Sequence, residues 1–198
     1  MASRIKGVNN ISAVDTLQSN EAHLKVLHWF FSYPTGAIGL NDLADALDIA
    51  KTTAKTIVLQ LIEEGFLQRE ILGRMWRITV NSKHPYNFTR KICYNLNMIS
   101  ESGIIPLIYK LLDNPKAIIL FGSYRKGDDN EKSDIDIAVE ISGNDDVQIM
   151  ELGKISRFGY RKNVAVNAYI FSRNRIDLNI FANIANGIVL DGFLEVRP

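Results

Sequence analysis

The sequence predicts an α+β protein in two parts, one helical with a small β-hairpin and the other built on a β-sheet. Apolar residues recur at helical spacing within residues 24–61 and then alternate through residues 76–80, which marks a change from a helical to a strand period. Further along, two apolar runs rich in β-branched residues, 117–121 and 135–139, are typical of buried strands. The chain of 198 residues is long enough for two small domains. We place their boundary between residues 83 and 84.

Composition and charge exclude several classes of protein. Apolar residues make up 46% of the chain and charged residues 23%, which is ordinary for a globular protein and excludes a disordered or fibrous one. There are 23 lysines and arginines against 22 aspartates and glutamates, so the net charge is +1. A chain this close to neutral cannot attract nucleic acid through its overall field. A nucleic-acid partner must therefore bind a local basic patch.

Three further features concern the environment of the protein. The most continuous apolar stretches, such as 117–121, have five residues, whereas a helix that spans a bilayer needs about 20. The first residues, Met1 to Arg4, lack the apolar core of a signal peptide. The single cysteine, Cys93, cannot form an internal disulfide. We therefore expect a cytoplasmic protein with no membrane partner.

The amino-terminal part predicts three helices. In the first, residues 24–31 are apolar at helical spacing and Pro34 ends the helix. A short helix follows around 43–47, and a longer one begins near Lys51 and stops at Gly65. Four apolar residues of the longer helix form one buried stripe: Ala54, Ile57, Val58 and Leu61. This stripe leaves four polar residues facing outward: Lys51, Thr52, Lys55 and Thr56.

A β-hairpin follows the third helix, because residues 66–72 and 75–80 flank Gly73 and every second residue of 76–80 is apolar. The order of helix, short helix, longer helix and hairpin, and the stretch 43–67 in particular, resembles the winged helix-turn-helix family. The resemblance implies a recognition helix in the major groove and a wing on the DNA backbone. It makes six residues candidates for binding duplex DNA: Lys51, Thr52, Lys55, Thr56, Arg74 and Arg77.

Winged helices also serve as protein-interaction or dimerisation modules, and the charge of this part leaves that alternative open. Residues 50–80 hold five basic and three acidic residues, an excess of two positive charges. Because a fold does not determine a function, contact with DNA and formation of a homodimer both remain hypotheses for this domain.

Residues 84–113 predict a helical connector. Apolar residues recur at helical spacing from Ile92 to Ile99, a break follows at 102–103, and a helix resumes through Leu112. The segment is as apolar as the rest and has no run of glycine and serine, so we expect it to pack against both parts rather than act as a flexible linker. Three of its residues have no partner at metal-ligand spacing, and we interpret them as structural: His84, Cys93 and Met98.

In the carboxy-terminal part, polar residues stand at the ends of two predicted strands. The apolar run 117–121 ends in Gly122 and Ser123, which predicts a buried strand that turns into a short helix. A glycine lets a phosphate approach the main chain, and the serine hydroxyl can donate to a phosphate oxygen. Asp134 and Asp136 lie two residues apart on the next strand, so both carboxylates share one face, roughly 6.6 Å apart along it. Mg²⁺ binds through one or two carboxylates together with substrate phosphates.

Together, the Gly-Ser pair, the ten-residue interval and Asp134-Ile135-Asp136 resemble the signature of the nucleotidyltransferases of the DNA polymerase β superfamily. The resemblance covers 117–139 without a gap and implies a mixed β-sheet with flanking helices. It implies that Asp134 and Asp136 are catalytic and hold Mg²⁺, or Mn²⁺ in its place. It also implies that five residues bind the nucleoside triphosphate: Gly122, Ser123, Arg125, Lys126 and Asn167. For Arg125 and Lys126 the alternative is a solvated turn.

Active members of the superfamily usually carry a third carboxylate on a later strand, and here that position holds Asn167. We predict the later strand over 164–171, after a helix over 147–160, with Asn167 on the polar side of the strand. An asparagine carbonyl can bind a cation but cannot accept a proton as a carboxylate does. Glu140 shares the face of Asp136 but lies roughly 13 Å beyond it along the strand, too far to replace the missing acid.

The order of segments along the whole chain also resembles a group of prokaryotic fusions between a winged helix and a minimal nucleotidyltransferase. Besides the motifs above, this second resemblance rests on residues 84–86, 167–172 and 188–192, and it implies that asparagine is usual at the later-strand position. We therefore predict a winged helix-turn-helix domain over 1–83 and a helical connector plus nucleotidyltransferase domain over 84–198.

Three hypotheses follow for the function. The first is a transferase that moves a nucleoside monophosphate from a nucleoside triphosphate to a hydroxyl acceptor, for example on a protein. The second is a transcriptional regulator or antitoxin-like protein that binds duplex DNA, while a catalytically weak nucleotidyltransferase fold senses nucleotide or pairs with a toxin-like partner. The third is a structural adaptor that binds neither metal nor triphosphate near Asp134.

Overall fold

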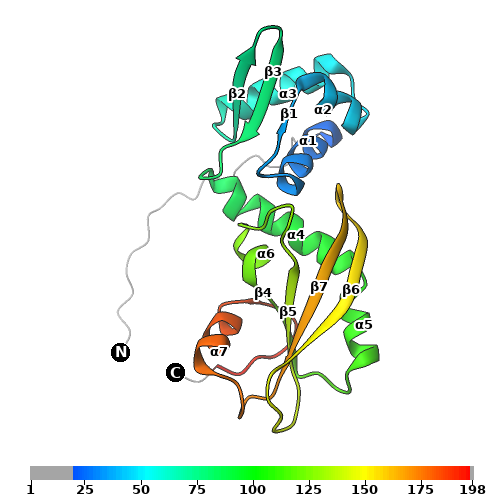
Figure 1. Cartoon of the computed structure of the whole chain (residues 1–198), viewed down its shortest axis with the longest axis vertical. Helices are drawn as coiled ribbons and strands as arrows, with labels where there is room; N and C mark the ends of the chain where they lie inside the picture. Colours follow the sequence, from blue (N-terminus) through cyan, green and yellow to red (C-terminus); the bar gives the residue numbers. More distant parts are fainter. Residues whose placement is uncertain (1–19, 197–198) are drawn as a thin grey trace, which may run out of the picture.

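The computed structural model of the protein describes residues 20–196. The segment Met1 to Arg4, discussed above for its lack of a signal-peptide core, lies outside the described residues. Among residues 20–196, every helix is too short or too polar to reach across a bilayer. Figure 1 shows two sheets, each with its own helices, and helix α4 (Arg90–Glu101) running between them.

The amino-terminal part contains three helices and a small antiparallel sheet. Its elements are α1 (Glu21–Ser32), β1 (Ala37–Ile38), α2 (Leu40–Leu47), α3 (Lys51–Glu63), β2 (Leu67–Leu72) and β3 (Met75–Val80). The three predicted helices and the hairpin are confirmed. The structure adds β1, which pairs with β3 and gives the sheet order β1-β3-β2. A strand of two residues is too short for its alternation to be visible in the sequence.

These elements enclose a core of their own. The stripe predicted on α3 is buried, with Ala54, Val58 and Leu61 fully inside, and it packs in one cluster with apolar residues of α1 and β3. The ring of Phe31 on α1 meets the ring of Phe66 edge to face, with centroids 5.6 Å apart. Because α3 buries this stripe, its opposite face is turned to solvent.

The predicted connector is helical. It consists of η2 (Pro85–Phe88), α4 and α5 (Ile104–Leu111), with the break at Gly103, whose φ is +80°. The buried residues of α4 are Lys91, Tyr94, Asn95 and Ile99, so the buried face is rotated from the apolar stripe that the sequence suggested. Tyr94 belongs to the core of the amino-terminal part and Ile99 to the core beneath the second sheet. Helix α4 therefore packs against both parts, and the domain boundary at residues 83 and 84 stays a prediction.

The carboxy-terminal part is a mixed five-stranded sheet with flanking helices. Its elements are β4 (Ala117–Phe121), α6 (Gly122–Lys126), β5 (Ile135–Glu140), β6 (Gln148–Phe158), β7 (Arg161–Phe171), α7 (Leu178–Ala185) and β8 (Ile188–Gly192). The strand order is β6-β7-β5-β4-β8, in which β5 and β7 run parallel and the other neighbours antiparallel. The predicted α+β class, with a winged helix-turn-helix followed by a mixed sheet, is confirmed.

One predicted element is wrong: residues 147–160 contain strand β6 and not a helix. Strand β6 pairs with β7 along its whole length, and a β-bulge between Glu151 and Gly153 shifts the register by one residue. Such a shift interrupts the alternation of apolar and polar positions. Apolar residues consequently recur every third position, as in a helix: Ile149, Leu152, Ile155 and Phe158.

The two faces of the five-stranded sheet are covered by different helices. Side chains of α4 and α5 pack on one face, against residues such as Leu120 and Ile137. Helix α7 packs on the other face, through Ile184, against Ile119 and Ala138. Asp136 emerges on this second face, two residues before Ala138 and beyond the half that α7 covers.

A buried ion pair attaches the loop after α6 to helix α4. The Lys91 ammonium lies 3.2 Å from the Asp129 carboxylate, and the two side chains are 1% and 4% exposed. The Asn95 amide donates to the same carboxylate at 2.8 Å. Buried charges are tolerated only when they are paired and hydrogen-bonded, and removal of one partner leaves the other uncompensated.

We expect Lys91→Met to lower the free energy of unfolding by about 3–5 kcal/mol, because it leaves the Asp129 carboxylate buried without its counter-charge. Urea unfolding at neutral pH measures this change. Lys110→Met, at an exposed position, should stay within about 0.5 kcal/mol of the parent protein. The double variant Lys91→Met/Asp129→Asn should recover part of the loss. A Lys91→Met protein as stable as the Lys110→Met control would contradict a structural role for the ion pair.

Candidate functional site

The predicted Gly-Ser bend lies directly against one of the two predicted aspartates. Strand β4 pairs with β5 so that Phe121 is opposite Asp136, and the chain then turns at Gly122 with φ +71°. A Cβ atom at position 122 would lie 2.7 Å from Asp136 Oδ2. Glycine is required here for both its positive φ and the close approach of the carboxylate. The bend and the aspartate therefore form one site.

The two aspartates differ in their surroundings. Asp134 immediately precedes β5 and is exposed, whereas Asp136 is within β5 and half-buried. Burial and, to a lesser extent, the negative charge of Asp134 raise the pKa of Asp136, while a hydrogen bond from Asn167 opposes the rise. A carboxylate with a raised pKa beside a second carboxylate is stabilised by any cation that binds between them.

Asn167 is the third member of the site. It lies on β7 opposite Asp136 of the parallel strand β5, as the sequence predicted for the later-strand position. Since the amide nitrogen donates to Asp136, the carbonyl oxygen of the same side chain is directed elsewhere. The residues that the structure describes hold no cluster of three or more acidic, histidine or cysteine side chains placed to hold a metal.

This donor set fits a magnesium ion better than a transition metal. Two carboxylates are hard oxygen donors, and Mg²⁺ keeps several coordination positions for water and phosphate oxygens. Because Gly122 has no Cβ, its main chain lies directly against the Asp136 carboxylate, so a phosphate at the bend could meet an ion held by that carboxylate. The residues present therefore fit the cation that the sequence predicted.

The remaining residues predicted to bind nucleotide lie on the short helix α6. Ser123 follows the bend and is half-buried, as is Arg125, while Lys126 is exposed. In the part of the chain that the structure describes, neither of these two cations forms an ion pair with an acidic side chain. Their charges are available to an anionic ligand, and the solvated turn remains the alternative.

The loop between the two motifs is held by a buried arginine that the sequence analysis missed. Arg161, the first residue of β7, donates at 3.0 Å to the main-chain carbonyls of Glu131 and Ser133 and also to the Tyr124 hydroxyl. Ser133 immediately precedes Asp134, so the guanidinium fixes the backbone from which that carboxylate projects. Arg161 lies before the apolar alternation of residues 164–171, and no sequence signal marked it as buried.

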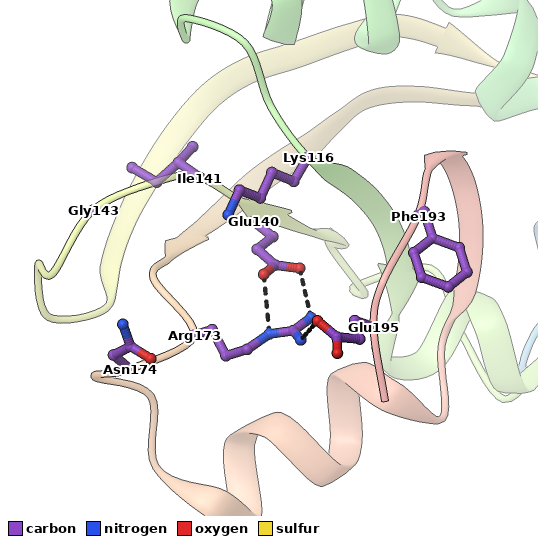
Figure 2. Close-up of a pocket in the computed structure, with 8 residues that line it drawn as sticks. All are labelled: Lys116, Glu140, Ile141, Gly143, Arg173, Asn174, Phe193 and Glu195. Carbon is purple, nitrogen blue, oxygen red and sulfur yellow. Dashed lines mark hydrogen bonds and ion pairs between the residues drawn. The ribbon is translucent and has the colours of Figure 1, made fainter. Parts of the chain in front are cut away.

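Glu140 has a structural role at the other end of β5, as the distance along the strand suggested. It is 2% exposed, and its carboxylate lies 3.2 Å from Arg173 Nε. Figure 2 shows Arg173 between Glu140 and Glu195 at a cavity of about 460 Å³. Because its charge is already paired, Glu140 is not a ligand of the predicted site.

The predicted DNA-binding residues of α3 share one exposed face. Four residues on this face are exposed: Lys51, Thr52, Lys55 and Thr56. The ring of Trp76 on β3 lies 5.9 Å from the Lys55 ammonium and 4.4 Å from the Arg69 guanidinium. Arg69 was missed because its position on β2 gave no sign of this contact. The stacked cations join the helix to the wing in one basic surface.

The two predicted wing residues differ in their availability. Arg74 occupies the turn between β2 and β3 and is exposed. Arg77 lies opposite Glu70 on the neighbouring strand, and its guanidinium is 3.4 Å from that carboxylate. Arg74 is therefore the freer of the two to contact a phosphate.

We expect Asn167→Asp to make the stability of the protein depend on a bound cation, because a third carboxylate beside Asp136 adds electrostatic repulsion. Without Mg²⁺ the variant should melt a few degrees below the parent at neutral pH, since about 1 kcal/mol corresponds to roughly 2–4 °C for a chain of this size. A carboxyl whose pKa is raised on folding loses stability as the pH rises, so the deficit should shrink in acid. Adding Mg²⁺ should remove it.

Melting temperatures with and without Mg²⁺ measure this effect. Asn174→Asp, an exposed position near the other end of the sheet, is the matched control. If Mg²⁺ shifts both variants equally, positions 136 and 167 do not share a cation.

Comparison of the chain with protein families gives two matches. Residues 104–190 match polymerase beta, nucleotidyltransferase, a range that includes the bend, both aspartates and Asn167. Residues 23–70 match the IclR helix-turn-helix domain, a range that covers most of α1, all of α2 and α3, and most of β2. No curated protein matches the chain. The chain thus joins an IclR-type helix-turn-helix domain to a nucleotidyltransferase domain of the polymerase beta family.

Proposed function

We propose that the protein is a Mg²⁺-dependent nucleotidyltransferase that moves a nucleoside monophosphate from a nucleoside triphosphate to a hydroxyl acceptor. The observation that carries the proposal is the contact between the Gly122 bend and the Asp136 carboxylate, in a domain of the polymerase beta nucleotidyltransferase family. A glycine bend that brings main chain and carboxylate together suits a polyphosphate bridged to a protein by a cation.

Asp134 and Asp136 are the groups that would hold the cation. Bound there, Mg²⁺ or Mn²⁺ neutralises charge on the triphosphate and on the leaving pyrophosphate. The raised pKa of Asp136 means that protons compete with the cation at this carboxylate as the pH falls. Asn167 holds Asp136 by a hydrogen bond, which fixes the direction of the carboxylate before a ligand arrives.

The bend orients the triphosphate in this proposal. Gly122 leaves the main chain open to a phosphate, and the Ser123 hydroxyl donates to one of its oxygens. Arg125 and Lys126, on the same short helix, add positive charge near the phosphates. The acceptor hydroxyl then attacks the α-phosphorus, and the bond from that phosphorus to the bridging oxygen breaks as pyrophosphate leaves.

We expect Asp134→Asn and Asp136→Asn each to lower the rate of pyrophosphate release by about 100-fold or more, because each removes a charged ligand of an ion worth several kcal/mol to the reaction. The assay supplies Mg²⁺ and each common ribonucleoside triphosphate labelled on the α-phosphate, and follows pyrophosphate and labelled product. Asp128→Asn, an exposed residue of the same loop, is the control. Equal rates in all three variants would remove the transferase proposal.

A nucleotide-sensing regulator is the second candidate, and Asn167 favours it. With asparagine at this position, the site has one acidic group fewer than active members of the superfamily usually have. Such a site would bind nucleotide without transferring it, as a sensor or an antitoxin-like protein would. Calorimetry with Mg²⁺ and a non-hydrolysable triphosphate separates the candidates. Binding that depends on Asp134, without any pyrophosphate release, supports the regulator.

For the amino-terminal domain we propose binding to duplex DNA. The exposed face of α3 carries two lysines and two threonines side by side on successive turns. The contacts of Lys55 and Arg69 with the Trp76 ring extend this surface to the wing. The alternative is a protein contact, such as a homodimer. It is supported by three apolar residues exposed on the wing: Ile71, Leu72 and Met75.

We expect Lys51→Ala/Lys55→Ala to weaken binding to DNA taken from upstream of the gene, and to reduce the slope of log affinity against log salt by about 2, roughly one for each lost phosphate contact. Gel shifts over a series of salt concentrations measure both quantities. Lys110→Ala/Lys116→Ala removes two exposed lysines from the other domain and serves as the control. Absence of binding by the parent protein at low salt would favour the protein contact.

A further inference from the structure

Strand β6 carries an acidic residue in line with the proposed metal site. Glu151 on β6 lies opposite Asn167 on β7, and Asn167 lies opposite Asp136 on β5. Side chains of residues that lie opposite one another on neighbouring strands project from the same face of the sheet. Glu151, Asn167 and Asp136 therefore form one row across three strands.

The row lies on an accessible part of the sheet. Glu151 is exposed, and Asn167 and Asp136 are half-buried. Along the face, the row is bordered by Tyr169, whose ring packs edge to face on Phe121 with centroids 5.0 Å apart. Glu151 forms no ion pair within the described residues, so its carboxylate is available to a ligand.

The β-bulge of β6 begins at Glu151. The register shifts between Glu151 and Gly153, whose φ is +112°. Bulges redirect side chains and are frequent beside active sites. Here the shift puts Lys154, opposite Ala165 on β7, on the same face as Glu151. Without the extra residue, the side chains at 151 and 154 would project from opposite faces.

The spacing across the row leaves room for a substrate. Neighbouring strands are about 4.8 Å apart, so the backbones at 136 and 151 are separated by roughly 10 Å. Glu151 is not part of any metal-binding cluster among residues 20–196. Its position suits contact with a hydroxyl that approaches a phosphate held at Asp136.

We infer that Glu151 is the proton acceptor of the transfer reaction, in place of the acid that Asn167 replaces. The inference rests on the proposed function. The hydroxyl oxygen of the acceptor, or of water, forms a bond to the α-phosphorus and gives its proton to the Glu151 carboxylate. The bond from the α-phosphorus to the bridging oxygen breaks, and its electron pair leaves with pyrophosphate. No oxidant or reductant takes part.

The other groups on this face do not suit the role. Asp134 and Asp136 are the proposed metal ligands, and Asn167 cannot accept a proton. Burial and the two aspartates raise the pKa of the Tyr169 phenol, which keeps it protonated at neutral pH. Lys154 is a cation whose charge suits the triphosphate or the departing pyrophosphate. Glu151 is the remaining carboxylate.

Glu151→Gln tests the inference, because it keeps the size of the side chain and removes its basicity. With Mg²⁺, α-labelled ribonucleoside triphosphates and water as acceptor, the variant should release pyrophosphate about 100- to 10,000-fold more slowly than the parent. Calorimetry with Mg²⁺ and a non-hydrolysable triphosphate should give the affinity of the parent. Glu63→Gln, exposed on α3, is the control.

The outcomes separate the inference from the proposed function. Slow release with unchanged binding supports Glu151 as the proton acceptor. Release at the parent rate overturns the inference and leaves the transferase intact. Slow release with weakened binding overturns it as well, since Glu151 would then be a ligand. If the parent protein releases no pyrophosphate, or Asp134→Asn releases it equally fast, the proposed function fails and the inference fails with it.

Discussion

The guanidinium of Arg161 organises the candidate site from within the protein. It binds the carbonyls of Glu131 and Ser133 and thereby holds a loop that otherwise has few apolar contacts. The ion pair of Lys91 and Asp129 also holds this loop. Ordering a loop costs conformational entropy, and buried charge-assisted hydrogen bonds offset that cost. The aspartates thus project from a backbone that is already fixed before any ligand binds.

Other hydrogen bonds to this loop and to the β6–β7 hairpin join the two domains. Thr35, in the turn after α1, donates through its amide and its hydroxyl to the Glu131 carboxylate, and the Tyr33 hydroxyl donates to the Tyr160 carbonyl at the tip of the β6–β7 hairpin. The interface between the domains is therefore held by hydrogen bonds between partly exposed side chains and by the apolar packing around Tyr94. The helix-turn-helix domain therefore lies against the loop that carries Asp134.

Sequence patterns predicted those parts of the fold and site whose signals are local. Alternation placed the paired aspartates on one face and Asn167 on the polar side of its strand. The resemblance to the nucleotidyltransferase signature then grouped them with the glycine bend. Strand β6 was mistaken for a helix because the bulge at Glu151 breaks its alternation. The role of Arg161 depends on residues about 30 positions away in the chain, and no local pattern encodes such a contact.

The tip of the β6–β7 hairpin has a consequence for how this sequence can vary. Gly159 lies so close to the Tyr94 hydroxyl that a methyl group in place of its hydrogen would collide with it. The tip is thus anchored against α4. The number of residues in each arm of the hairpin therefore decides which residues of β6 and β7 lie beside Asp136. Deletion of one residue from either arm would turn Glu151 or Asn167 to the opposite side of the sheet. An insertion or deletion in one arm is tolerable only when a second insertion or deletion in that arm returns its side chains to their original faces of the sheet.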